Sequence, residues 1–259
     1  MQIVTISLKQ RNKIPIEADS INPDNIAGKT EDEIKTMLVW YGNRQCPLGE
    51  LFNVKVEGKD STENTIIVIN GDVSRVKRIG QGMSSGEIEI NGNVDMHCGS
   101  NMKGGKIVIN GNADSWLGCE MMGGEIVLNG NGGYYVGGGY RGEACGMKGG
   151  KITVNGNVRD YLGEHMCGGE IHVMGNAGLL PAIMNNGGNI IIEGNTEMPA
   201  SEMKKGTVII KGEVRDLLPS YLEEGTEEVN GVLYHRFIGD VNNGGKGVLL
   251  INKLQDNLT

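Results

Sequence analysis

The sequence contains few aromatic residues, few prolines and no long hydrophobic run. Its 259 residues include two Phe, two Trp and seven Tyr, so the core must be built mostly from aliphatic side chains and methionine. The six prolines, with no glycine at every third position, exclude a collagen-like chain. No apolar stretch approaches the roughly 20 residues of a membrane-spanning helix, and the amino terminus lacks the pattern of a signal peptide. We therefore expect a cytoplasmic protein.

Basic charge is also scarce. The chain has 24 Lys and Arg against 32 Asp and Glu, for a net charge of −8. Nucleic acids and anionic membranes are therefore not expected as partners, because the chain has no excess of basic residues to neutralise their phosphates. The five cysteines are an odd number and form no CxxC pair, so we expect reduced thiols that pack as small apolar groups.

Glycine, in contrast, is abundant. It supplies 43 of the 259 residues, more than twice its usual share of about 7%. With 38% hydrophobic residues, and glycines that alternate with Ile and Val, the chain is not a disordered linker. The placement of the glycines must explain their number.

A repeat of about 19 residues explains that placement. Each copy ends in a short apolar strand followed by an anchor glycine, at Gly71, Gly92, Gly111, Gly130, Gly156, Gly175, Gly194 and Gly212. One interval, from Gly130 to Gly156, carries seven extra residues. A second glycine lies six residues before each anchor from Gly92 on, and three residues before that lies Met83, Met102, Met121, Met147, Met166 or Met203. In the copy that ends at Gly194, Asn185 takes the methionine position.

One strand per repeat predicts an all-β fold, a parallel β-helix in which each repeat is one rung. The Ile and Val residues two and four positions before the anchor are expected to point inward, and the methionines to fill another side of the interior. The alternative is a β-meander, because Asn-Gly between apolar alternations is also a strong hairpin signal. The half of each repeat without the strand is rich in glycine and weak as a second strand, which favours the β-helix.

Both ends of such a solenoid need a cover. We assign residues 1–62 to an N-terminal cap with one strand and one helix, residues 63–214 to the repeats and residues 215–259 to a C-terminal cap. The cap helix is expected to begin at Thr30, with Glu33 completing a capping box, and to end at Gly42. Its apolar stripe consists of Ile34, Met37, Leu38 and Tyr41.

The glycine-rich insertion at residues 132–142 is the candidate binding site. Residues 137–142 match G-x-G-x-x-G, but they lack the strand-to-helix context of a dinucleotide site. Departures from a repeat tend to gather on a binding face. We therefore consider a ligand or docking role for Tyr134, Tyr135, Tyr140 and Arg141, with a plain bulged loop as the alternative.

The sequence gives no pattern of catalytic or metal-ligating residues. Its four histidines, at positions 97, 165, 172 and 235, fall in different registers of the repeat. No nucleophile elbow, Walker loop or H-E-x-x-H motif occurs. We assign no catalytic residue and no metal ligand to this chain.

The repeats and the cap together resemble the C subunit of formylmethanofuran dehydrogenase. The resemblance rests on the Met-x-x-Gly-x-Ile-x-Ile-x-Gly units and on the cap segments at residues 22–25 (NPDN) and 48–54 (LGELFNV). The repeat half is also similar to the C-terminal domain of the glutamate synthase large subunit and to the C subunit of the formyltransferase/hydrolase complex. These two remain alternatives.

The resemblance implies a right-handed β-helix that serves as a structural, non-catalytic subunit of a cytoplasmic oxidoreductase complex. That complex reduces CO2 and forms N-formylmethanofuran in the first step of methanogenesis. Its tungsten- or molybdenum-pterin, iron–sulfur clusters and dinuclear zinc belong to other subunits, so no cofactor is expected here. The implied partners are amidohydrolase-like, formate-dehydrogenase-like and ferredoxin-like subunits. A contact with methanofuran through Tyr135, Tyr140 and Arg141 is a further hypothesis.

Overall fold

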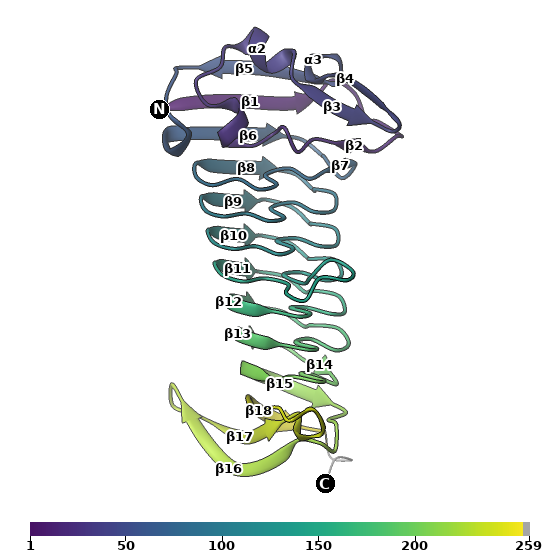
Figure 1. Cartoon of the computed structure of the whole chain (residues 1–259), viewed down its shortest axis with the longest axis vertical. Coiled ribbons are helices and arrows are strands. Elements are labelled where there is room, and N and C mark those ends of the chain that lie inside the picture. Colours follow the sequence, from purple (N-terminus) through teal and green to yellow (C-terminus); the bar gives the residue numbers. More distant parts are fainter. Residues whose placement is uncertain (256–259) are drawn as a thin grey trace.

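The computed structural model describes residues 1–255, and residues 256–259 of the expected C-terminal cap lie outside the described part. The chain is mostly β-structure, which confirms the expected all-β class. Its centre is a stack of rungs between two caps (Figure 1). Each rung contributes one strand to this stack, which we call the parallel coil: β6 (Thr65–Asn70), β8 (Glu87–Asn91), β9 (Lys106–Ile109), β10 (Glu125–Leu128), β11 (Lys151–Val154), β12 (Cys167–Val173), β13 (Asn186–Ile192) and β15 (Lys205–Arg215).

Strands of successive rungs pair in parallel and in the register of the repeat. Ile107 of β9 pairs with Ile88 of β8 on one side and with Ile126 of β10 on the other. The same pairing continues from β10 to β15. Since a meander requires antiparallel neighbours, the alternative fold is excluded.

The interior of the parallel coil is aliphatic and rich in methionine. Strand residues two and four positions before each anchor glycine, such as Ile107 and Ile109, are fully buried. A second stack consists of fully buried methionines: Met83, Met102, Met121, Met147, Met166 and Met203. Asn185 continues this stack in place of methionine, and its amide oxygen accepts the Gly187 N–H at 3.0 Å.

Glycine is required at the two fixed positions of the repeat for different physical reasons. A Cβ at Gly111 would collide with the backbone of Gly92 one rung earlier, so the anchor glycine allows close approach of neighbouring rungs. Gly105, six residues before that anchor, has φ +81°, a conformation that glycine adopts readily. The glycine content therefore reflects backbone geometry.

The N-terminal cap extends the sheet and adds a small second one. In the cap, β1 (Gln2–Leu8) runs parallel to β6 and antiparallel to β5 (Phe52–Glu57). The second sheet contains β2 (Ile16–Glu17), β3 (Leu38–Tyr41), β4 (Arg44–Pro47) and β7 (Val76–Lys77). The helical segments are α1 (Pro23–Ile26), α2 (Glu31–Lys35), α3 (Leu48–Leu51) and the 3₁₀ turn η1 (Thr62–Asn64).

The cap helix begins as expected but is much shorter. Thr30 and Glu33 form the capping box, which confirms that prediction. Helix α2 ends at Lys35, however, and Leu38 and Tyr41 belong to strand β3, so the predicted apolar stripe is wrong. The segment contains Val39, Trp40 and Tyr41, which favour a strand once a partner is available. Pairing with β2 and β4 supplies that partner.

The C-terminal end of the parallel coil is closed by an antiparallel hairpin. Strand β18 (Gly247–Leu254) continues the stack in parallel with β15, and β14 (Thr196–Glu197) also pairs with β15. Strands β16 (Leu222–Val229) and β17 (Val232–Gly239) then fold back, followed by the 3₁₀ turn η2 (Val241–Asn243). Leu249 and Ile251 of β18 are fully buried against the last rung.

The α-helices of residues 1–255 have four or five residues each, and none has the length or the apolar character to cross a membrane.

Candidate functional site

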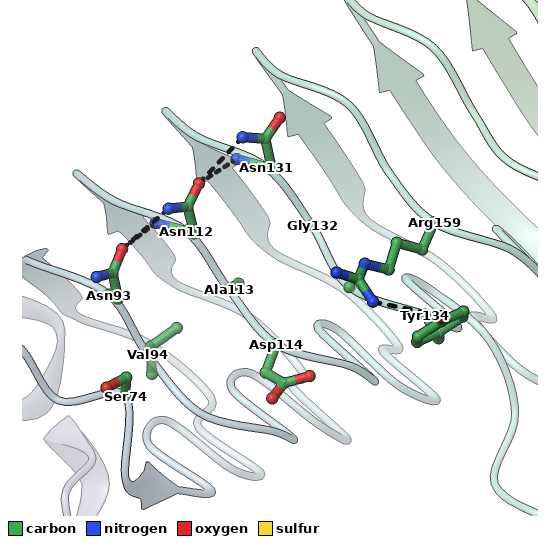
Figure 2. Close-up of a pocket in the computed structure, with 11 residues that line it drawn as sticks. Ser74, Asn93, Val94, Asn112, Ala113, Asp114, Asn131, Gly132, Tyr134 and Arg159 are labelled. Carbon is green, nitrogen blue, oxygen red and sulfur yellow. Dashed lines mark hydrogen bonds between the residues drawn. The ribbon is translucent and has the colours of Figure 1, made fainter.

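A groove of about 450 Å³ runs along one side of the coil, beside a row of asparagines (Figure 2). The amide oxygen of Asn93 accepts the backbone N–H of Asn112 at 2.9 Å, and that of Asn112 accepts the N–H of Asn131 at 2.8 Å. The row continues to Asn195 with the same geometry. Each asparagine side chain thus ties two rungs together, in addition to backbone hydrogen bonds such as that from the Val94 N–H to the Asn112 carbonyl at 2.9 Å.

Tyr134 and Arg159 form one wall of this groove. An Arg159 guanidinium nitrogen donates to the Tyr134 hydroxyl at 3.3 Å, and the guanidinium carbon lies 5.2 Å from the centre of the tyrosine ring. Asp114 also lines the groove, but one of its carboxylate oxygens accepts the backbone N–H of Ser115 at 2.6 Å. The groove therefore offers amides, one cation and one carboxylate, without a nucleophile beside a base.

A ladder of stacked rings lies at another corner of the coil. It consists of His97, Trp116, Tyr135 and Tyr161, one from each of four successive rungs. Neighbouring centroids are 5.3, 5.1 and 4.9 Å apart, and the ring planes differ by 12°, 8° and 7°. All four residues have positive φ, between 58° and 64°, so the same backbone turn aims each ring in the same direction. We call this row the aromatic ladder.

The insertion folds against the aromatic ladder. Tyr140 is 54% exposed, and its ring is tilted by 54° to His97 and by 53° to Trp116. Its backbone N–H donates to the Glu120 carboxylate at 3.2 Å. The far end of the insertion is fixed by a disulfide between Cys145 and Cys167, whose Cα atoms are 5.6 Å apart.

This disulfide corrects the expectation that every cysteine is a reduced thiol. Cys145 is bonded to Cys167, which lies 22 residues further along the chain. Cys46, Cys98 and Cys119 are free and buried. Burial raises the pKa of both the Cys98 and the Cys119 thiols to about 12, so these two remain protonated and unreactive near neutral pH.

The four sequence-selected site residues do not form one site. Tyr134 faces the asparagine groove, whereas Tyr135 belongs to the aromatic ladder and Tyr140 covers part of it. Arg141 is exposed beside them. Burial raises the pKa of the Tyr135 hydroxyl above its usual value, with Glu164 and Tyr161 acting in the same direction and Arg141 opposing it.

His97, Trp116 and Tyr161 are the residues of this corner that the sequence reasoning missed. Trp116 and Tyr135 are 19 residues apart, and His97 lies 19 residues before Trp116. That shared register was the available signal, because residues one period apart meet on neighbouring rungs.

The described residues contain no side-chain group suited to hold a metal ion. Within residues 1–255, no group of three or more His, Cys, Asp or Glu side chains could hold a metal ion. On the outer strand face, a carboxylate oxygen of Glu193 lies 2.7 Å from His172 Nε2 and 2.8 Å from Lys211 Nζ. This is a surface ion-pair cluster without a nucleophile.

Comparisons with known proteins place this architecture among components of larger complexes. No family model matches the sequence. The structure is similar to a chain in the crystal structure of the formyltransferase/hydrolase complex from Methylorubrum extorquens with methylofuran. Here the TM-score is 0.88 and the identity 27%, and the match covers 95% of this chain and 98% of that one.

Curated relatives of the chain include C subunits of several formylmethanofuran dehydrogenases. The sequence is 52% identical over 229 residues to the C subunit of tungsten-containing formylmethanofuran dehydrogenase 2 of Methanococcus maripaludis, covering 88% of this chain and 83% of that protein. It is 44% identical over 100 residues to the protein of the same name from Methanothermobacter marburgensis. It is 45% identical over 97 residues to the C subunit of molybdenum-containing formylmethanofuran dehydrogenase 1 of Methanosarcina barkeri. These last two matches span only 37% and 32% of the relatives' length.

Proposed function

The chain belongs to the family of formylmethanofuran dehydrogenase C subunits, and we propose that it is a structural, non-catalytic subunit of such a complex. The proposed complex reduces CO2 and forms N-formylmethanofuran in the first step of methanogenesis. The observation that carries the proposal is the 52% identity over 83% of the Methanococcus maripaludis relative.

The structure supports a scaffold role. The parallel coil is a continuous sheet of in-register strands with a fully buried core, and both of its ends are covered. Such a rod holds surfaces on distant rungs at fixed spacing. We infer that the coil is a right-handed β-helix, because crossover connections between parallel strands of one sheet are right-handed in nearly all proteins.

We propose that the redox chemistry belongs to partner subunits. The names of the relatives describe their enzymes as tungsten-containing or molybdenum-containing. In this chain the free cysteines are buried and no described cluster offers a metal-ligand set. We therefore assign the metal-pterin, iron–sulfur and dinuclear zinc groups to amidohydrolase-like, formate-dehydrogenase-like and ferredoxin-like partners in a cytoplasmic complex.

A second candidate is the C subunit of a formyltransferase/hydrolase complex. The match to 98% of a chain from that complex favours it. A glutamate-synthase-like module is the third candidate, supported only by the similarity of its repeats.

Affinity purification of the tagged full-length chain from its native host tests these assignments. We expect subunits with a molybdopterin-type and a ferredoxin-like sequence to co-purify in fixed ratio. Recovery with formyltransferase subunits alone would instead support the second candidate. A chain recovered as a stable monomer would contradict every scaffold role.

We also propose that Tyr134, Tyr135, Tyr140 and Arg141 contact a partner subunit or methanofuran. The insertion departs from the repeat, and Tyr140 and Arg141 are exposed on it. Replacing Tyr135, Tyr140 and Arg141 by Ala should weaken retention of the partners or raise the KM for methanofuran. Arg44→Ala in the N-terminal cap is the control, and an unchanged triple variant would contradict the proposal.

A further inference from the structure

A small cavity lies between the parallel coil and the insertion. It has a volume of about 200 Å³. Its lining includes Arg78, His97 and Glu120 from the corners of the coil, Tyr140 from the insertion and Glu143 directly after it. Pockets for cofactors and drug-sized ligands usually measure roughly 300–1,000 Å³. The cavity therefore suits one side chain of another molecule better than a whole cofactor.

Two inclined aromatic surfaces form part of the cavity wall. His97 belongs to the aromatic ladder, and its ring is stacked on Trp116 at a tilt of only 12°. The Tyr140 ring is inclined by 54° to His97, with 5.8 Å between the centroids. Aromatic faces attract cations through the negative potential above the ring.

The cavity also has an excess of negative charge. Its one cation, Arg78, donates to Glu17 at 3.1 Å and to Gln81 at 3.0 Å. Neither Glu120 nor Glu143 takes part in an ion pair within residues 1–255. Two carboxylates thus face the cavity without a cationic partner.

His97 does not offset this negative charge. Burial is the main reason that its pKa lies below the usual 6.5, and Arg78 and Lys77 lower it further, against the smaller opposing effects of Glu17 and Glu120. The lowered pKa favours the neutral imidazole, which does not repel a cation.

We propose that this cavity binds the guanidinium group of an arginine side chain presented by a partner subunit. A guanidinium is planar, stacks on aromatic rings and forms paired hydrogen bonds to carboxylates, so it matches both the walls and the charges. A lysine ammonium is a strongly hydrated point charge and matches only the charges. The inference rests on the proposed function only for the source of the arginine.

The cavity is held in place before any partner arrives. The Tyr140 backbone N–H donates to the Glu120 carboxylate at 3.2 Å, which joins the insertion to the coil. The Cys145–Cys167 disulfide fixes the insertion at its other end. Such preorganisation lowers the entropic cost of binding.

A small-molecule probe tests the cavity on the full-length chain. Trp40 and Trp116 are the two tryptophans of the sequence, so Trp40→Phe leaves the fluorescence of Trp116, which lies beside the cavity wall, as the only tryptophan signal. We expect N-acetyl-arginine amide to change this fluorescence with saturation on the order of 1 mM. N-acetyl-citrulline amide, a neutral compound of similar shape, should bind at least about tenfold more weakly, and the lysine analogue should lie between them.

Substitutions of cavity residues test whether the fluorescence change arises from binding in the cavity. Glu120→Gln combined with Glu143→Gln should weaken arginine binding by about tenfold or more, and Tyr140→Ala by about threefold to tenfold. Glu63→Gln, at an exposed position in the 3₁₀ turn η1, is the matched control and should change nothing. Circular dichroism identifies any variant that fails to fold, and in that case the arginine and citrulline titrations of the Trp40→Phe chain decide.

Three results would overturn the inference: equal binding of arginine and citrulline, no saturable signal from the folded chain, or an effect of Glu63→Gln equal to that of the double variant. These titrations contain no partner protein. Their failure therefore leaves the co-purification result intact, and a failed co-purification leaves the arginine site intact.

Discussion

The indole ring of Trp116 lies on the phenol ring of Tyr135, with the centroids 5.1 Å apart and the planes within 8°. The two residues are 19 positions apart in the sequence, which is one turn of the parallel coil. Residues at the same position of two successive repeats therefore contact each other on neighbouring rungs. The aromatic ladder is the clearest result of this relationship on the surface.

Removing one of the two inner rings of the ladder should destabilise the chain. Trp116→Ala eliminates two stacked contacts, with His97 and Tyr135, and stacked aromatic pairs contribute about 0.5–1.5 kcal/mol each. We expect a loss of about 1–3 kcal/mol in the free energy of unfolding, measured by urea denaturation. Trp40→Ala, at a position 44% exposed, should cost less than about 0.5 kcal/mol. Equal losses for both variants would contradict a stabilising role of the ladder.

Adjacent methionines give a sharper test of the core. Met121 is fully buried in the methionine stack, whereas Met122 is 42% exposed. Met121→Ala should lower the free energy of unfolding by about 2–5 kcal/mol because it leaves a cavity between two rungs. Met122→Ala should lower it by less than about 0.5 kcal/mol. If the two variants unfold at the same urea concentration, the methionine stack does not carry the stability assigned to it.

The disulfide can be tested by counting thiols. The denatured, unreduced chain should expose three thiols, and the reduced chain five. Cys145→Ser should lower the free energy of unfolding by about 2–4 kcal/mol under non-reducing conditions, because the covalent link no longer restricts the unfolded chain. Reductant should destabilise the wild type and leave Cys145→Ser unchanged. Five thiols without reductant would show that the bond is absent.

His97 should make stability depend on pH. Burial, followed by Arg78 and Lys77, holds its pKa below 6.5 in the folded chain, so the unfolded chain takes up the proton first as the pH falls. This contribution to stability is fully present above pH 6.5. It is lost as the pH falls from there toward the folded pKa. His97→Phe keeps a ring in the ladder and should flatten this part of the urea-midpoint profile. An NMR titration that gives His97 a pKa above 6.5 would contradict the sign.

Much of the parallel coil could be predicted from short-range patterns. Alternating Ile107 and Ile109 indicate a strand with one buried face, and the same pattern recurs with the period of the rung. Anchor glycines such as Gly111 lie where rungs approach each other too closely for a side chain. The capping box of Thr30 and Glu33 was equally local, since it spans a single helical turn.

The cap helix shows where local patterns fail. Spacing of apolar residues predicted a helix through Tyr41, but the chain leaves α2 at Lys35 and pairs β3 with β2 and β4. Leu38 and Trp40 are exposed on β3, and Val39 between them is buried. That alternation belongs to a strand, and only the pairing partners decided between the two structures.

The sequence alone determined the repeat, its buried positions and its family, because each of these depends on residues a few positions apart or on a fixed period. Only the tertiary structure decided that Cys145 meets Cys167 and that Tyr140 closes a cavity against His97. The physical reason is the insertion. It breaks the period, and where the period is broken the position in the repeat no longer says which side chains are neighbours.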